Sequence, residues 1–431
     1  MTMPETLWVR AGATKLDRAV RHAVLAAYRG PRYGACWLRR PLLWLRERLW
    51  RIPVIVQMTP DCPQWERLTL INGLRRRRSA SVRELALVRG MAARVSLREL
   101  KELIDHPGVQ RVYFDRPVRA LLDVAAPSVG ADRVWQQGGS GRGVTVAIVD
   151  TGIHPHEDFL QPEPRIVGFR DFVRGRSRAY DDNGHGTHVA GIVAGSGARS
   201  GGRYRGIAPE ANLVAVKVLD RFGFGSMSTV IAGIQWVVEQ RARLGIRVLS
   251  LSLGAAATGG YEDDPVAQAA GAAWQAGIVV CAAAGNDGPE AGTIASPGIH
   301  PSVITVGATD DRGSPDRGDD GVASFSSRGP TPDGLMKPDL VAPGTEITAP
   351  QAPGSQLAKQ LGSKNAPYAT LSGTSMATPV CAGIVALMLE RDPLLGPDDV
   401  KARLLTTARD LGWPADAQGA GLVDAERAVL G

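Results

Sequence analysis

The sequence predicts an α/β fold whose centre is a mostly parallel sheet with helices on both faces. Five apolar runs are typical of buried strands: 144–149, 213–218, 248–253, 278–282 and 303–306. Helical segments follow or separate them, at 186–194, 229–243, 266–276, 378–390 and 398–407. Apolar strands that alternate with helices indicate a doubly wound sheet. Since such sheets bind ligands beyond the carboxyl ends of their strands, we look for chemistry in the loops that follow them.

Length and charge suggest that this sheet is one of several parts. A chain of 431 residues can form two or three domains, and its hydrophobic fraction of 44% is ordinary for a globular protein. Residues 1–52 contain eleven Lys/Arg and three Asp/Glu, whereas the rest of the chain is nearly neutral. An electrostatic partner would therefore meet the N-terminal segment.

We expect residues 1–52 to form a basic, amphipathic helical extension. Leu16, Val20 and Val24 recur at helical spacing among arginines, and 37–50 mixes Leu and Trp with arginine. One reading is an arm that packs its apolar face on the rest of the protein, and this is the reading we favour. The other is contact with a membrane surface or nucleic acid. No nucleic-acid motif is present, so we expect no such partner.

Residues 53–120 are expected to form a small α+β unit. Strands are predicted at 54–56, 86–88, 92–95 and 109–114, and helices at 65–74 and 97–104. Ser96 and Glu99 form the pattern of a capping box before the second helix. The order β-α-β-β-α-β is that of a ferredoxin-like fold. Residues 121–130 are predicted to be a linker, and 131–431 the main domain.

The cysteines and the absence of a leader favour a cytoplasmic protein. Four cysteines (Cys36, Cys62, Cys281 and Cys381) show no metal-ligand spacing, and we expect buried free thiols. Residues 1–30 lack the compact apolar region and cleavage site of a secretory signal. No apolar run is long enough to span a membrane.

The stretch 371–379, with the sequence LSGTSMATP, carries the clearest sign of chemistry. It leads into the apolar run 380–389, which is typical of a buried helix. Ser375 is thus placed at or near a helix N-terminus, where free N–H groups and the helix dipole favour developing negative charge. A serine hydroxyl is a weak nucleophile at neutral pH and needs a base.

Three upstream residues could supply what Ser375 lacks. Asp150 ends an apolar strand, His185 stands between glycines at the start of a helix, and Asn286 lies in a glycine turn after another strand. A histidine can take up and return a proton near neutral pH. Alone, Asp150 could be a cap or turn residue. His185 and His188 could suggest a metal, but no third ligand keeps their spacing.

These motifs resemble those of the subtilisin-type serine peptidases, the subtilases. Segments 150–152 (DTG), 185–188 (HGTH) and 373–379 (GTSMATP) occur in the order Asp, His, Ser, and the resemblance covers about residues 130–430. It implies a subtilisin-like fold and a serine endopeptidase that hydrolyses peptide bonds through an acyl-enzyme. Asp150, His185 and Ser375 would form the triad, and Asn286 the oxyanion hole. Within the family the chain is most similar to intracellular AprX-type bacterial subtilases, partly through 15–18 (KLDR).

The resemblance also implies a groove that holds an extended peptide by backbone pairing. The expected substrate-binding residues are Gly223, Phe224, Gly225, Ser252, Leu253, Gly254, Ala283, Ala284 and Gly285. Tight turns are the alternative explanation for some of them. Ala283 and Ala284 suggest an open, apolar pocket for the residue before the scissile bond.

By the same resemblance, residues 53–120 occupy the place of an inhibitory prodomain whose tail lies in the groove. We therefore expect a zymogen that processes itself, with cleavage within 115–128. No cofactor is required. Calcium is possible as a structural ion, but acidic clusters such as 181–182 and 262–264 are explained as well by solvated loops. The alternative from another class is a pseudoprotease that binds peptides without cleaving them.

Overall fold

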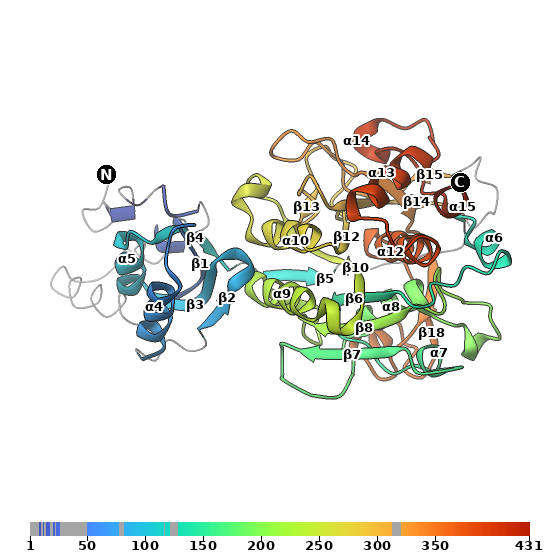
Figure 1. Ribbon diagram of the computed structural model, residues 1–431, viewed down its shortest axis with the longest axis horizontal. Coiled ribbons are helices and arrows are strands. Elements are labelled where there is room, and N and C mark those ends of the chain that lie inside the picture. Colours follow the sequence, from blue (N-terminus) through green and yellow to red (C-terminus); the bar gives the residue numbers. More distant parts are fainter. Residues whose placement is uncertain are drawn as a thin grey trace. The chain divides into compact units, whose positions relative to one another are not determined.

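The computed structural model describes residues 8–9, 12, 14–17, 20–21, 23–25, 50–76, 82–115, 117–120, 128–312 and 320–431. The chain divides into two compact units, Met1–Arg116 and Pro117–Gly431 (Figure 1). Most of the expected extension, including 37–49, and most of the expected linker lie outside the described residues. Among those described, no helix is both long and apolar enough to cross a membrane.

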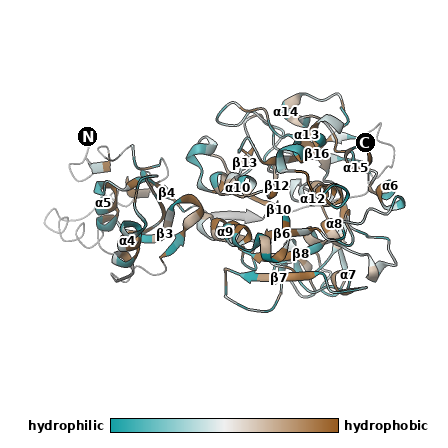
Figure 2. Cartoon of the chain, viewed as in Figure 1, coloured by the Kyte–Doolittle hydropathy of each residue, from teal (hydrophilic) through white to brown (hydrophobic). Residues whose placement is uncertain are grey.

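The larger unit is built on the expected parallel sheet. Its strands run in the order β15-β14-β12-β10-β6-β8-β7, with β16 paired to β14, and every pair but β14–β15 is parallel. The strands are β6 (Thr145–Asp150), β7 (Ile166–Asp171), β8 (Asn212–Lys217), β10 (Ile246–Leu251), β12 (Val279–Ala283), β14 (Ile304–Asp310), β15 (Gly321–Val322) and β16 (Leu340–Pro343). Figure 2 shows hydrophobic residues along these central strands.

Two helix pairs cover the sheet. Helix α8 (His185–Ala194) packs on α12 (Thr374–Arg391), and α9 (Met227–Leu244) packs on α10 (Pro265–Gln275). Strands β10, β6 and β8 lie between the two pairs in Figure 1. The remaining helices are α6 (Ala131–Gln136), α7 (Glu157–Leu160), α11 (Gln356–Gln360), α13 (Pro397–Thr407), α14 (Ala415–Gln418) and α15 (Ala425–Leu430). The predicted main strands and helices are therefore confirmed, and the fold is α/β with a mostly parallel sheet.

Two smaller sheets complete this unit. One has the order β13-β11-β5-β9, and the other pairs β17 with β18. Their strands are β5 (Pro117–Ala120), β9 (Phe224–Ser226), β11 (Leu253–Ala256), β13 (Ala295–Ser296), β17 (Ile347–Pro350) and β18 (Tyr368–Leu371). The last four residues of the expected prodomain, 117–120, thus pair with the larger unit.

The smaller unit has the predicted order of elements. Its antiparallel sheet, β2-β3-β1-β4, carries helices after β1 and β3. The elements are β1 (Arg51–Met58), α4 (Gln64–Arg76), β2 (Arg83–Leu85), β3 (Gly90–Ser96), α5 (Leu97–Asp105) and β4 (Val109–Phe114). The capping box is present, with Glu99 N donating to Ser96 Oγ at 3.2 Å and Ser96 N to Glu99 Oε2 at 2.7 Å.

One predicted strand of this unit was wrong. Residues 86–88 form a 3-10 helix, and the strand lies three residues earlier, in β2. The apolar triplet Ala86-Leu87-Val88 gives no period that separates a strand from a helical turn. Arg89 follows with a φ of 50°, which closes the turn and starts β3.

The described part of the N-terminal segment belongs to the core of the smaller unit. Val9, Leu16, Val20 and Val24 are buried in the same apolar cluster as strands β1, β3 and β4. Leu16 forms a parallel bridge with Val112 of β4. At these residues, the segment packs its apolar face on the strands of the smaller unit, to which it belongs, as the favoured reading predicts.

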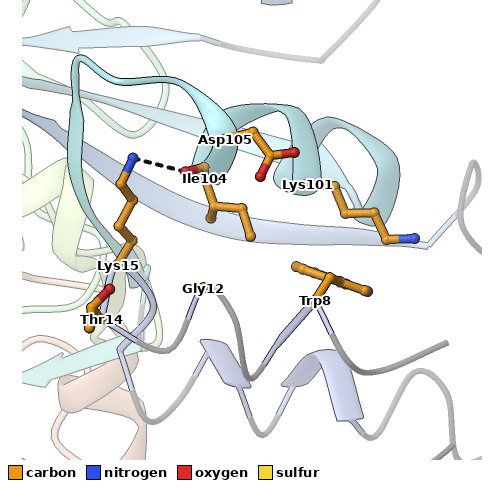
Figure 3. A pocket seen from close by; sticks show the side chains of 7 residues that line it. All are labelled: Trp8, Gly12, Thr14, Lys15, Lys101, Ile104 and Asp105. Carbon is orange, nitrogen blue, oxygen red and sulfur yellow. Dashed lines mark hydrogen bonds between the residues drawn. The ribbon is translucent and has the colours of Figure 1, made fainter. Parts of the chain in front are cut away.

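Lys15 connects this segment to the end of α5 through two hydrogen bonds. Its Nζ donates to the carbonyl oxygens of Ile104 at 2.9 Å and His106 at 2.8 Å (Figure 3). These carbonyls belong to the last turn and the exit of the helix, where acceptors lack helical partners and a cation also meets the negative end of the dipole. Gly12 allows close packing beside it, because a Cβ there would lie 2.6 Å from Ile104 Cδ1.

We predict that Lys15→Met lowers the free energy of unfolding of the smaller unit by about 1–2 kcal/mol, because two carbonyls lose a charged donor. Arg98→Met is the control, since Arg98 is exposed and its i,i+4 pair with Glu102 contributes a few tenths of a kcal/mol at most. Denaturant unfolding in a Ser375→Ala background, which excludes proteolysis, measures both. Equal effects of the two substitutions would contradict the anchoring role.

Candidate active site

Asp150 and His185 form a buried pair. Asp150 is the last residue of β6, and His185 is the first residue of α8. His185 Nδ1 lies 2.8 Å from Asp150 Oδ1 and 2.9 Å from Oδ2. Both side chains are fully buried. The carboxylate thus fixes the orientation of the imidazole and favours the tautomer that carries the proton on Nδ1.

Ser375 lies in the first turn of α12, as the sequence predicts. Gly373 occupies the N-cap position, and Pro379 stands inside the helix. Since proline has no N–H, the carbonyl of Ser375 lacks its usual i+4 donor. Ser252 Oγ, just after β10, donates to this carbonyl at 2.8 Å, and Ser375 Oγ donates to the Ser252 carbonyl at 3.2 Å. This reciprocal pair ties the start of α12 to the end of β10.

The register of the sheet brings the two pairs to one edge. In the parallel pairing of β6 with β10, Ile148 faces Ser250. Asp150 and Ser252 each follow two residues later, so they lie at the same level of neighbouring strands, which are separated by about 4.8 Å. Asp150 binds His185, and Ser252 binds Ser375.

Asn286 reaches the same edge from the turn after β12. Its Oδ1 accepts from Thr374 N at 2.9 Å and from Thr374 Oγ1 at 3.1 Å. With the carbonyl oxygen of the amide engaged, Nδ2 is left as the outward donor. Gly285 makes the turn possible: its φ is 113°, and a Cβ would lie 2.7 Å from Ser327 Oγ.

Four of the expected substrate-binding residues, Phe224, Gly225, Leu253 and Gly254, pair with a single inserted strand. β5 pairs antiparallel with β9 through Val118–Gly225 and Arg119–Phe224, and with β11 through Arg119–Gly254 and Ala120–Leu253. Strands β9 and β11 are therefore two strand spacings apart, about 10 Å, with room for one extended backbone. Phe224 is 46% exposed, whereas Ala283 and Ala284 are fully buried at the end of β12.

Nothing in the described residues forms a cluster of three or more metal-ligating side chains. His188 Nε2 donates to the carbonyl of Ala369 at 3.1 Å, and burial lowers the pKa of His188 to about 3. It is a neutral structural residue. Two residues of the acidic clusters, Asp181 and Asp264, accept hydrogen bonds from N–H and O–H donors, and calcium as a structural ion stays a prediction.

The environment of Asp181 differs from the one that the sequence predicted. A solvated loop was one expected explanation, but Asp181 is only 6% exposed and bonds to the loop after β6 and the start of α8. A signal was available: an aspartate shortly before a helix that begins after Gly184 matches a capping pattern. Thr151 donates to Asp181 and Lys217 donates to Thr151, and nothing comparable in the sequence indicates their roles.

Comparison with known proteins places these features in context. A sequence profile described as "Subtilase family" matches residues 141–422. Serine protease AprX of Bacillus subtilis (strain 168) is 43% identical, with 98% of each chain covered. Subtilisin DY of Bacillus licheniformis is 37% identical over 70% of this chain and 97% of its own.

A solved structure gives a similar fold. The crystal structure of fervidolysin from Fervidobacterium pennivorans, whose title calls it a keratinolytic enzyme related to subtilisin, superposes with a TM-score of 0.68. The match covers 88% of this chain and 61% of that one at 23% identity. It supports the α/β architecture and nothing finer.

Ser252→Ala should destabilise the protein by about 1–3 kcal/mol, because it leaves the buried Ser375 carbonyl without a donor. Ser250→Ala is a matched control from the same strand: Ser250 Oγ is buried and has no partner among the described residues, so its removal should be neutral or stabilising. Thermal and denaturant unfolding in a Ser375→Ala background compare the two. Similar losses from both would rule out the role given to Ser252.

Proposed function

The chain belongs to the subtilase family and is a serine endopeptidase, and on this premise we propose that Asp150, His185 and Ser375 are its catalytic triad. The observation that carries the proposal is the Asp150–His185 contact at 2.8 and 2.9 Å, at the same sheet edge as Ser375. In this scheme His185 takes the proton from Ser375 as its oxygen attacks the peptide carbonyl. Asp150 orients the imidazole and stabilises the imidazolium that forms.

The oxyanion is then stabilised by fixed donors. We assign Asn286 Nδ2 and the backbone N–H of Ser375 to this role. Ser375 N belongs to the first turn of α12, where the helix dipole is positive, and the Asn286 side chain is bound to Thr374 of the same turn. The tetrahedral intermediate collapses to an acyl-enzyme on Ser375, and His185 gives its proton to the leaving amine. Water, activated by His185, releases the second product.

Substrate recognition follows from the two facing strand edges. A peptide in place of β5 would pair with β9 on one side and β11 on the other, which is recognition by strand addition. This mode depends on the peptide backbone, so it suits an endopeptidase that acts on unfolded protein segments. We assign substrate binding to residues 223–225, 252–254 and 283–285.

We further propose that the chain is a zymogen whose residues 53–120 form a ferredoxin-like inhibitory prodomain. The support is β5 itself, whose residues 117–120 fill the position that a substrate strand would take. Cleavage after Ala120, inside the predicted range 115–128, would separate this strand from the rest of the larger unit. A cytoplasmic location is proposed with it; the free thiols of Cys62, Cys281 and Cys381 suit a reducing compartment, and cell fractionation tests it.

Wild type and Ser375→Ala, incubated with denatured casein and followed by intact mass, test the triad and self-processing together. We expect casein hydrolysis and an N-terminally trimmed mass only for the wild type, with a loss in rate of about 10⁶, a magnitude known from subtilisin itself. Hydrolysis that persists in the variant would refute Ser375 as nucleophile. Peptide binding without turnover by the wild type would indicate a pseudoprotease.

Asn286→Ala should lower kcat about 10²–10³-fold with little change in KM, again a magnitude taken from subtilisin. The reason is that the amide acts on charge that develops only in the transition state. Steady-state kinetics on a peptide p-nitroanilide measure both constants. A change confined to KM would place Asn286 in substrate binding instead.

A further inference from the structure

We propose that Asp181 is a positioning residue that sets His185 against Asp150, by fastening the start of α8 to the loop after β6. The inference rests on the proposed roles of Asp150 and His185. Asp181 contacts neither of these side chains in the bonds described below. It acts through the backbone on which each stands.

Five donors converge on the Asp181 carboxylate. Its Oδ1 accepts from Thr151 Oγ1 at 2.9 Å, Asn183 N at 3.1 Å and Gly184 N at 2.8 Å. Its Oδ2 accepts from Thr187 N at 2.9 Å and Thr187 Oγ1 at 2.6 Å. Both oxygens are therefore saturated, and the side chain is only 6% exposed. A neutral amide at this position could not accept all five bonds.

Asp181 is one of three side chains that cap a helix whose N-cap glycine has none: His185 N donates to Asn183 Oδ1 at 3.1 Å, Gly186 N to Thr151 Oγ1 and Thr187 N to Asp181 Oδ2. Gly184, at the N-cap of α8, has a φ of 108° and offers no acceptor to the free N–H groups of the first turn. Asp181 reaches in from three residues earlier and accepts from Gly184 N, Thr187 N and the Thr187 hydroxyl. The carboxylate also meets the positive end of the helix dipole. His185 is the first residue of the helix that is held in this way.

The other partner of Asp181 is Thr151, which follows Asp150 directly. Each polar group of Thr151 is engaged: N donates to Asp150 Oδ1 at 2.6 Å, Oγ1 donates to Asp181, and the carbonyl accepts from the buried Lys217 Nζ at 2.6 Å. Thr151 Oγ1 also accepts from Gly186 N at 2.8 Å. A continuous set of bonds therefore links the residue after Asp150 to the residue after His185.

The backbone after β6 and the backbone at the start of α8 are so close that a small shift of one would displace the other. A Cβ on Gly186 would lie 2.2 Å from the carbonyl oxygen of Gly152 and 3.1 Å from Asp150 Oδ1. At Gly186 no side chain separates the segments, so the hydrogen bonds between them contribute directly to their spacing. Displacement of a catalytic group by about 1 Å can cost about 10² in rate. Asp181 is the acceptor common to both segments, so its loss should move His185 relative to Asp150.

Asp171 provides a matched control. It is 5% exposed and accepts from Val173 N, Arg174 N, Arg176 N and the Tyr180 hydroxyl. Three amides and one hydroxyl thus bind a buried carboxylate there too. Asp171 ends β7, at the far edge of the sheet and two strands away from β6. Asp171→Asn therefore measures the cost of losing a buried, saturated carboxylate without the link to His185.

The test compares full-length Asp181→Asn, Asp171→Asn and wild type on a peptide p-nitroanilide, with unfolding measured in a Ser375→Ala background. We expect Asp181→Asn to lower kcat about 10²-fold with KM changed by less than about threefold. Asp171→Asn should keep kcat within about threefold at a similar loss of stability. Equal losses of kcat from the two variants, or a loss in KM alone, would overturn the proposal.

A second pair of variants keeps the test decisive if Asp181→Asn does not fold. Thr187→Ser retains the hydroxyl that donates to Asp181, and Thr187→Val removes it at nearly constant shape. Activity that follows the hydroxyl, with kcat about tenfold higher for Ser than for Val, supports positioning; equal kcat values contradict it. An inactive, fully processed wild type would instead contradict the proposed function, and the positioning role with it.

Discussion

The register of the parallel sheet is the constraint on which the site depends. A register shift lies between Ile246 and Val248 of β10. Beyond it, β6, β10 and β12 pair in phase, so their carboxyl ends finish at one level, and Leu251 of β10 faces Ala282 of β12. Asp150, Ser252 and the turn that carries Asn286 therefore reach one edge although they are far apart in the sequence. A shift of one residue in any pairing would send alternate side chains to the other face and separate these groups.

At this edge, backbone groups left without partners do much of the positioning. Pro379 removes a helical donor, and Ser252 takes the freed carbonyl of Ser375. Gly184 provides no cap for α8, and Asp181 supplies one. In both helices the N-cap residue is a glycine without a capping side chain, so side chains from neighbouring segments bond the free N–H groups of the first turn. The cost of each irregularity is met by a side chain from a neighbouring segment.

The sequence was sufficient for the architecture and insufficient for the contacts that hold the candidate site residues in place. Apolar runs such as 144–149 and 248–253 identify buried strands because a parallel sheet hides both faces of each strand. Three strands have no such pattern: β7 is a half-exposed edge strand, and β9 and β11 have only three and four residues. The strand expected at 86–88 failed for the same reason, since three apolar residues define no period. Asp181 was misjudged because its burial is decided by segments remote in sequence, Thr151 above all.

The groove edges and the inserted strand are best understood together. Without β5, the facing backbones of β9 and β11 would present unpaired N–H and C=O groups about 10 Å apart, and open strand edges promote unwanted pairing with other chains. β5 satisfies both edges at once. The backbone N–H and C=O groups that allow a peptidase to pair with extended substrates would thus also pair with other chains during folding. A strand from its own chain is the simplest solution, because it is present at high effective concentration from the moment of synthesis.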